Sequence, residues 1–394
     1  MANKIKIGIT QGDSAGVGWE VILKALADGR MGEMATFVLY GSRTASELYR
    51  RTLDEAHGSD GGSDGGMQLQ VVSSARHANP KSINLVNIAD GRGVDGGSGD
   101  AAEAFEPGKP TPSTGSVAVK ALRAAVADLR DGSIDALVTA PICKENSVGD
   151  NFRFAGHTEF LAAEFPTTIP ESTDKSAAGV SGGAVMVMCT SGGLRVALVT
   201  SHMALADVPG AISKEKIVGK LRTLRRSLIQ DFGVVEPRVA VLALNPHAGE
   251  GGLMGTDEVE VIAPAIAEAR AEGVLAFGPF AADGLFLSGE YAKYDAILAM
   301  YHDQGLAPFK ALAPAGVNFT AGLSVVRTSP DHGTAFDIAG RGVANPDSMR
   351  EAIYAAIDIF RRRAAWGEMT KNPLKHYERE KGDERTIDLS KNEI

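Results

Sequence analysis

Residues 238–247 read RVAVLALNPH, and this stretch decides the class of fold. Apolar side chains occupy successive positions from residue 239 to residue 244, as in a strand that is covered on both faces. Two similar stretches, LRVALVT at 194–200 and DAILAM at 295–300, predict further buried strands. Each of the three is followed within a few residues by a histidine: His202, His247 and His302. Strands buried on both faces are typical of parallel sheets.

The rest of the chain alternates strands with helices. Further predicted strands are Lys4–Thr10, Thr36–Tyr40, Asp135–Thr139 and Ala184–Met188. Apolar residues at helical spacing predict helices over Ser116–Arg130, Glu258–Glu272 and Met349–Trp366, the second with Thr256 as its N-cap. This alternation predicts an α/β fold with a mostly parallel sheet.

Length and composition exclude several classes of protein. A chain of 394 residues predicts two domains that share an interface. Lys plus Arg number 40 and Asp plus Glu 49, a net charge of −9, which argues against binding to nucleic acid or to anionic lipid. Two cysteines, Cys143 and Cys189, are too few for a disulfide framework or a cysteine-rich zinc module. The start, MANKIKIGIT, shows no leader, and no apolar run approaches the roughly 20 residues that span a bilayer, so we expect a cytoplasmic protein.

Several polar stretches predict surface segments. HGSDGGSDGG at 57–66 and GRGVDGGSGD at 91–100 are too rich in Gly, Ser and Asp to build a core. Pro170–Gly183 is a similar polar insertion, and the tail Lys371–Ile394 is highly charged.

The three histidines indicate a metal site. Ligand sites of open parallel sheets lie beyond the carboxyl ends of the strands, so three imidazoles at that edge could converge on one ion. Three nitrogen ligands and an open position are typical of catalytic zinc, and Asp303 stands next to His302 as a nearby carboxylate. Alternatively, each histidine only caps its strand and bonds to a loop. The residues alone leave both interpretations open.

Three glycine-rich segments could contact a ligand. GDSAGVGWE at 12–20 lacks GxGxxG spacing, which favours a tight strand-to-helix turn. HAGEGGLMG at 247–255 could be an anion cradle or a flexible connector. HGTAFDIAGRGVANP at 332–346 suits a loop around an adenine ring and ribose, with Asp337 for the hydroxyls, although a turn-rich connector has similar residues.

These motifs resemble known enzymes. HGTAFDIAGRGVANP looks like the NAD-binding loop of the isocitrate/isopropylmalate dehydrogenase superfamily. From about residue 4 to about residue 365 the chain resembles the PdxA family of 4-hydroxythreonine-4-phosphate dehydrogenases, through the motifs ITQGDSAGVGWE, APICK, GHTEF, TSHMAL, LNPHAGEGG, MYHDQGLAPFK and GVNFTAGLSVVRTSPDHGTA. The resemblance implies two α/β/α domains with a mostly parallel sheet and an active site in the interdomain cleft. It implies a discontinuous cofactor domain, 1–139 with 327–394, and a metal, substrate and dimerisation domain, 140–326.

The resemblance also implies roles for individual residues. It implies the divalent-metal ligands His202, His247 and His302, shared between the subunits of a homodimer, with His302 as a candidate from the partner chain. It implies the substrate ligands His157, Thr158, Lys310, Asn318 and Arg327, of which the cations suit phosphate or carboxylate. It implies the nicotinamide-cofactor residues His332, Gly333, Thr334, Ala335, Asp337, Ala339 and Asn345. Asp303, Asp283 and a metal-bound water are candidates for the catalytic base.

The implied reaction is an oxidation followed by decarboxylation. NAD or NADP takes a hydride from 4-phosphohydroxy-L-threonine, with a divalent metal (zinc, or else magnesium or cobalt) as Lewis acid. The product 2-amino-3-oxo-4-phosphooxybutanoate loses CO₂ and gives 3-amino-2-oxopropyl phosphate, a precursor of pyridoxal phosphate.

Two further functions compete with this one. A paralogue would oxidise D-threonate or D-erythronate 4-phosphate with the same metal and cofactor sites. A metal-dependent phosphohydrolase would use the open metal position to activate water. The intact HGTA and DIAG motifs argue against the hydrolase, which needs no dinucleotide.

The chain departs from the family at two positions. The family reads GDPAGIGPE where this chain has Ser14 and Trp19, so both prolines are absent. We expect a less rigid glycine turn as a consequence.

Overall fold

The computed structural model describes residues 4–56, 68–88, 105–147, 156–165 and 183–372. The predicted surface loops 57–66 and 91–100 lie outside these ranges, as do the insertion before residue 183 and the tail beyond residue 372.

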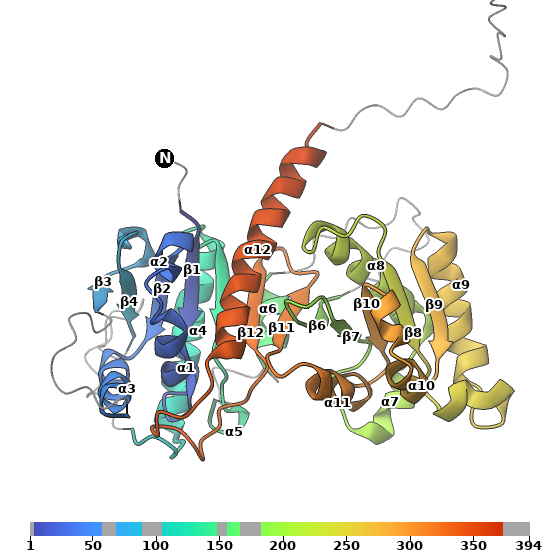
Figure 1. Cartoon of the computed structure of the whole chain (residues 1–394), viewed down its shortest axis with the longest axis horizontal. Coiled ribbons are helices and arrows are strands. Elements are labelled where there is room, and N and C mark those ends of the chain that lie inside the picture. Colours follow the sequence, from blue (N-terminus) through green and yellow to red (C-terminus); the bar gives the residue numbers. More distant parts are fainter. Residues whose placement is uncertain (1–3, 57–67, 89–104, 148–155, 166–182, 373–394) are drawn as a thin grey trace, which may run out of the picture.

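Twelve strands of the described chain form one sheet, in the order β3-β4-β2-β1-β5-β12-β11-β6-β7-β10-β8-β9 (Figure 1). The strands are β1 Lys6–Thr10, β2 Thr36–Gly41, β3 Leu69–Val72, β4 Ile83–Asn87, β5 Ala136–Thr139, β6 Val185–Cys189, β7 Arg195–Leu198, β8 Arg238–Leu242, β9 Leu275–Phe280, β10 Ala296–Ala299, β11 Val317–Ala321 and β12 Val326–Pro330. The antiparallel pairs are β6 with β7, β6 with β11 and β11 with β12; the other pairs are parallel. The prediction of a mostly parallel α/β sheet is confirmed. The predicted domain boundaries fall at the end of β5 and after the first residue of β12, and the two-domain division stays a prediction.

All seven predicted strands are present, and five more were missed. β3 and β9 are the edge strands of the sheet and are partly exposed, so they lack the continuous apolar run of a buried strand. β11 and β12 carry polar residues such as Asn318 and Arg327 within the sheet. Their apolar pattern is interrupted because these two strands also build the wall of a cavity.

Helices cover both faces of the sheet. They are α1 Gly18–Leu26, α2 Met31–Met34, α3 Arg43–Ala56, α4 Pro112–Arg130, α5 Lys144–Ser147, α6 His157–Glu164, α7 Val208–Ala211, α8 Lys214–Gln230, α9 Ala263–Ala271, α10 Ala282–Leu287, α11 His302–Leu312 and α12 Asp347–Thr370. No helix in the described ranges is both long enough and apolar enough to cross a bilayer.

The three predicted helices exist with different ends. α4 begins before residue 116, because the side chains of Thr111 and Thr114 each bond to the other's backbone N–H in a capping box. The predicted helix 258–272 is a π-helical turn, Glu258–Ile262, followed by α9. Asp257 already has helical backbone angles, and Glu260 N–H donates to the Thr256 carbonyl at 2.8 Å, so the helical stretch opens after Thr256 as predicted. α12 is longer than predicted and projects from the body of the molecule (Figure 1).

Apolar residues pack on both faces of the sheet. In β2, Phe37 and Leu39 belong to a core with residues of α1, α8 and α12, whereas Val38 and Tyr40 belong to a core with residues of α4 and α6. A third core joins α10 and α11 to β7, β8 and β10. Burial on both faces explains why the central strands are apolar at successive positions.

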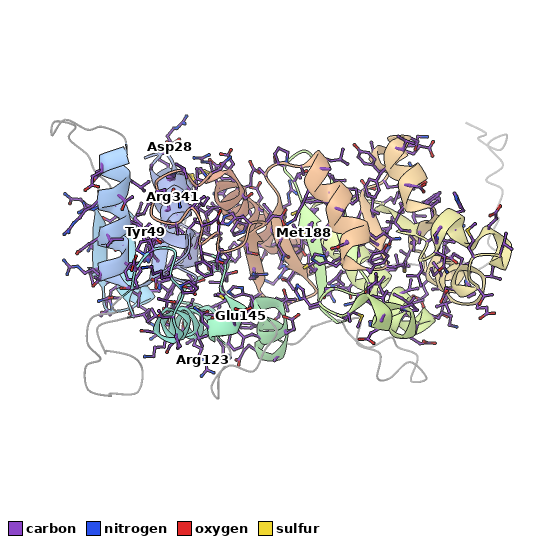
Figure 2. All side chains as sticks on the ribbon, turned by 90° about the horizontal axis from the view of Figure 1, so that it is seen from below. Asp28, Tyr49, Arg123, Glu145, Met188 and Arg341 are labelled. Atoms are coloured by element: carbon purple, nitrogen blue, oxygen red, sulfur yellow. The ribbon has the colours of Figure 1, made fainter. Side chains whose placement is uncertain are left out.

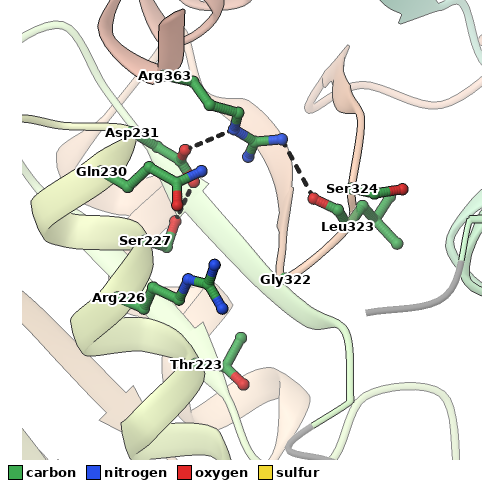
Figure 3. Close-up of a pocket in the computed structure, with 9 residues that line it drawn as sticks. All are labelled: Thr223, Arg226, Ser227, Gln230, Asp231, Gly322, Leu323, Ser324 and Arg363. Atoms are coloured by element: carbon green, nitrogen blue, oxygen red, sulfur yellow. Dashed lines mark hydrogen bonds and ion pairs between the residues drawn. The ribbon is translucent and has the colours of Figure 1, made fainter. Parts of the chain in front are cut away.

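Arg363 of α12 connects three elements of the fold (Figure 3). Its Nε donates to Asp231 Oδ1 at 2.9 Å, at the end of α8, and its Nη1 donates to the Leu323 carbonyl at 3.1 Å, in the β11–β12 turn. Asp231 also accepts from the Ser227 hydroxyl at 2.6 Å. The group borders a cavity of about 60 Å³. Because the Asp231 side chain is 2% exposed and that of Arg363 17%, the ion pair is largely shielded from water.

We predict that Arg363→Ala lowers the free energy of unfolding by about 3 kcal/mol, because it leaves the buried Asp231 carboxylate without its cation. Arg350→Ala on the same helix removes an exposed ion pair with Asp347 and is expected to cost less than about 1 kcal/mol. Urea unfolding followed by circular dichroism measures both values. Equal losses for the two variants would contradict the role given to Arg363.

Candidate active site

The three histidine-bearing strands are neighbours in the sheet. β10 pairs in parallel with β7 on one side and with β8 on the other, so their carboxyl ends lie at one edge. His202 follows β7, and His302 is the first residue of α11 after β10. The ring centroids of His202 and His302 are 6.1 Å apart. The prediction that these strand ends meet is confirmed for these two side chains.

A cavity of about 320 Å³ opens beside these two histidines. The predicted site residues that line it are His157, Thr158, His202, His302, Lys310, Asn318, Arg327, His332 and Gly333. Met188 of β6, near the middle of the molecule in Figure 2, contributes an apolar wall. The described residues that line it do not include His247, Asp283, Asp303, Thr334, Ala335, Asp337, Ala339 or Asn345.

His247 lies apart from the cavity in an unusual turn. The five residues from His247 to Gly251 all have left-handed backbone angles, with φ between 42° and 74°. Three of them, His247, Ala248 and Glu250, are not glycine, and each such residue costs roughly 1–2 kcal/mol in this conformation. In the described part of the chain no three His, Cys, Asp or Glu side chains gather closely enough to hold a metal ion. The three predicted ligands therefore do not converge within one chain.

The two cavity histidines are each held by a carboxylate. His202 Nδ1 lies 3.3 Å from Glu159 Oε1, and His302 Nδ1 lies 2.7 Å from Asp303 Oδ1. When Nδ1–H donates to a carboxylate, the lone pair on Nε2 is left for a metal, which is the usual arrangement of metal-binding histidines. The Asp303 side chain is 85% exposed, and its carboxylate contacts the His302 ring. Asp303 is not among the residues that line the cavity.

Cationic and amide groups also line the cavity. Arg327 is buried and donates from Nη2 to Thr139 Oγ1 at 2.6 Å. Burial lowers the pKa of Arg327 to about 10, while the negative charge of Glu159 opposes this shift, so the guanidinium stays charged at neutral pH. Lys310 Nζ lies 3.3 Å from Asp331 Oδ1. Asn318 Oδ1 is buried without a hydrogen-bond partner among the described residues, so it can accept from a ligand.

His332 presents a neutral imidazole to the cavity. Nδ1–H donates to the Gly333 carbonyl at 2.9 Å, and Nε2 is buried with no hydrogen-bond partner in the described chain. Burial lowers the pKa of His332, and the bond to Gly333 only partly opposes this effect. Its Nε2 is therefore an acceptor for a ligand proton at neutral pH.

Two acidic residues of the cavity were missed from the sequence. Glu159 stands two residues after His157 in the GHTEF motif, and Asp331 directly precedes His332. Burial raises the pKa of Asp331, although the charge of Lys310 acts in the opposite direction. Their positions beside the GHTEF motif and beside His332 could have indicated them. However, acidic residues next to histidines are common, so the residue type alone does not predict a site residue.

The glycine turn at 12–20 contacts the predicted cofactor loop. Gly12 has φ 71°, and a Cβ on Gly16 would lie 2.6 Å from the Thr334 carbonyl. Val17 N–H donates to the same carbonyl at 2.9 Å. The tight-turn interpretation fits these positions, since each requires a positive φ or a close backbone approach.

The two departures from the family occupy buried positions. Trp19 is fully buried, and its Nε1–H donates to Gln11 Oε1 at 2.8 Å. Ser14 is fully buried too, and its carbonyl accepts from the Tyr49 hydroxyl at 3.1 Å. The indole bond of Trp19 is a contact that proline could not make, whereas the Ser14 contact uses a backbone carbonyl that proline also carries, and the lower rigidity of the turn stays a prediction.

Together, a mostly parallel α/β sheet and a polar cavity beyond its strand ends, next to a glycine-rich loop, form the arrangement of an α/β enzyme that binds a small ligand. The chain belongs to the PdxA family: the profile described as "Pyridoxal phosphate biosynthetic protein PdxA" matches residues 33–356.

Curated relatives and solved structures agree with this membership. A 4-hydroxythreonine-4-phosphate dehydrogenase from Bacteroides thetaiotaomicron is 44% identical over 383 residues, which cover 97% of this chain and 96% of the relative. One from Caulobacter vibrioides is 40% identical and covers 91% of this chain and 98% of the relative. The crystal structure of the enzyme so named from Klebsiella pneumoniae superposes with a TM-score of 0.70 at 34% identity, covering 91% of this chain and 98% of that one.

We predict that the free energy of unfolding falls less between pH 7.5 and pH 5.5 in His332→Gln than in the wild-type protein. The folded pKa of His332 lies below the unfolded value of about 6.5, so its contribution is complete above pH 6.5 and is lost as the pH falls from there toward the folded pKa. Urea unfolding at pH 7.5 and pH 5.5 measures the difference. An equal loss of stability in both proteins would contradict a buried neutral imidazole.

Proposed function

We propose that this chain oxidises 4-phosphohydroxy-L-threonine to 2-amino-3-oxo-4-phosphooxybutanoate, which decarboxylates to 3-amino-2-oxopropyl phosphate in pyridoxal phosphate biosynthesis. NAD or NADP would accept the hydride. The observation that carries the proposal is the cavity that brings His202, His302, Lys310 and Arg327 together in a chain of this family.

The substrate's anionic groups would bind the cationic part of the cavity. Arg327 is fixed by Thr139 and offers a planar guanidinium that suits a carboxylate or a phosphate. Lys310 adds a second positive charge, and Asn318 Oδ1 can accept from the substrate's amino or hydroxyl group. His157 and Thr158 at the start of α6 supply further polar contacts. These groups would orient the secondary hydroxyl toward His202 and His302.

His202 and His302 would hold the divalent metal, which when bound would lower the pKa of the substrate hydroxyl. Their Nδ1 contacts with Glu159 and Asp303 leave Nε2 for the ion. Imidazole donors favour zinc over magnesium, which prefers oxygen ligands, and cobalt is a further candidate. His247 is the third proposed ligand.

A second copy of the chain would complete this metal site. The three histidines do not gather within one chain, so at least one of them would come from the partner of a homodimer. Large apolar side chains are exposed along the same segments: Leu205 after His202, Leu253 after the His247 turn and Leu287 on α10. Their exposed fractions are 69%, 79% and 91%, and exposed apolar groups of this size favour burial against another surface.

The cofactor would bind the loop 332–346. The loop forms no helix or strand, and His332 and Gly333 at its start line the cavity. Asp337 is exposed and can accept hydrogen bonds from ribose hydroxyls, while Thr334 contacts the glycine turn at Val17. Ala335, Ala339 and Asn345 stay predicted cofactor contacts.

Asp303 and Asp283 stay the predicted candidates for the base. Both lie outside the cavity of their own chain, and Asp283 is exposed on α10. A cytoplasmic location completes the proposal, since Cys143 and Cys189 are both free thiols.

A different substrate is the second candidate. A structure titled terephthalate 1,2-cis-dihydrodiol dehydrogenase, from Burkholderia xenovorans, superposes with a TM-score of 0.53 at 26% identity, covering 90% of this chain and 98% of that one. Related folds therefore carry dehydrogenases for other substrates. D-Threonate and D-erythronate 4-phosphate are the alternatives to test, and a phosphohydrolase would need no cofactor.

We predict nicotinamide reduction by metal-loaded protein with 4-phosphohydroxy-L-threonine and not with the two sugar-acid phosphates. Lys310→Met should lower kcat/KM about 10- to 100-fold, because it removes a charged hydrogen bond. Lys293→Met is the matched control: this exposed lysine pairs with Glu290 outside the cavity and should leave the rate unchanged. Reduction only with a sugar-acid phosphate would replace the proposed substrate, and phosphate release without cofactor would favour the hydrolase.

A further inference from the structure

The left-handed turn that carries His247 needs an external constraint. Three non-glycine residues in a row of five hold a conformation that they would not adopt alone. Within the turn, Met254 N–H donates to the Gly249 carbonyl at 3.1 Å, which closes the loop at its far end. The near end, where the chain leaves β8, is held by a different group.

Glu258 holds this near end. It is buried, with 2% of its surface exposed, and it begins the π-helical turn Glu258–Ile262. Its Oε1 accepts from the backbone N–H of Leu244 at 2.8 Å and from that of Asn245 at 2.7 Å. Its Oε2 accepts from Asn245 Nδ2 at 3.1 Å. One carboxylate therefore binds three donors in the two residues that precede Pro246 and His247.

The same carboxylate packs against the turn itself. A Cβ on Gly249 would lie 2.5 Å from Glu258 Oε2, so this glycine lets the turn close onto the carboxylate. Asn245 Nδ2 also donates to Asp257 Oδ2 at 2.9 Å, and a Cβ on Gly255 would lie 2.4 Å from that nitrogen. The start of the turn and the start of the π turn are thus joined into one unit.

We propose that Glu258 is a positioning residue for His247: it fixes the left-handed turn so that the imidazole is presented for metal binding. Glu258 does not line the cavity, so it acts through the turn. π turns occur often at functional sites, and here the π turn begins at the residue that binds the end of β8. The proposal rests on the metal site proposed above.

Glu258→Gln tests this with the smallest change of shape. The amide oxygen can still accept from the two backbone N–H groups, but its NH₂ group faces Asn245 Nδ2, a donor, so one bond is lost and two donors oppose each other. We expect Co²⁺ binding by the apoprotein, measured by calorimetry, to weaken about 10- to 100-fold. Amide hydrogen exchange at Leu244 and Asn245 should accelerate, while the cooperative unfolding transition persists.

Glu260→Gln is the matched control, since Glu260 is an exposed glutamate of the same π turn. It should change neither Co²⁺ affinity nor exchange. His247→Asn should weaken Co²⁺ binding, and adding Glu258→Gln to it should cause no further loss, because the two residues act on one ligand.

Wild-type Co²⁺ affinity in Glu258→Gln, or additive losses in the double variant, would overturn the proposal. If His247→Asn itself leaves Co²⁺ affinity unchanged, the proposed metal site fails instead. In that case the exchange rates at Leu244 and Asn245 still decide whether Glu258 holds the turn.

Discussion

The backbone hydrogen bonds that hold β10 between β7 and β8 place three strand ends at one edge of the sheet. The register sets Ile297 of β10 opposite Val196 on one side and Ala240 on the other. Residues that follow these strands must therefore leave the sheet side by side. His202 and His302 become neighbours for this reason, although 100 residues of chain separate them. The cavity, its carboxylate-held imidazoles and the proposed metal site all depend on this parallel alignment.

The antiparallel hairpin of β11 and β12 adds the polar side of the cavity to this edge. β11 brings Asn318 and β12 brings Arg327, each from within the sheet. A buried guanidinium is tolerated because Thr139 and Thr320 accept its hydrogen bonds. α12 packs across both strands, and its Arg363 binds the hairpin turn at Leu323. The helix α12 thus packs on the centre of the sheet and also constrains β11 and β12, the strands that would bind substrate.

Part of this arrangement could be predicted from the sequence. The apolar runs at 194–200, 238–244 and 295–300 predicted buried strands because burial on both faces leaves no room for alternation. The edge strands β3 and β9 could not be found in this way, since one side of each faces water. Arg327 was found only because its segment resembles a known motif. An arginine within an apolar segment can mark a functional site, but it can also mean that the segment is not a strand.

The sequence placed His247 after a buried strand, but it could not predict the left-handed turn that carries this histidine. The glycines of HAGEGG permit a left-handed turn but do not require one, and His247 itself disfavours it. What fixes the turn is Glu258, and its partners in space are backbone groups that carry no sequence signature. A metal ligand from a second copy could not be predicted either, because the sequence of one chain does not show which surfaces form an interface.

His202 and His302 line one cavity and His247 does not, so the proposed metal site would take His247 from the second copy, and mixing two inactive variants tests this arrangement. His202→Asn and His247→Asn each give inactive dimers, which are then mixed under conditions of subunit exchange. We expect recovery to about a quarter of the wild-type rate, because about half of the dimers would be mixed and each would hold one intact site. Mixed dimers that form, as shown by mass spectrometry, but stay inactive would contradict it.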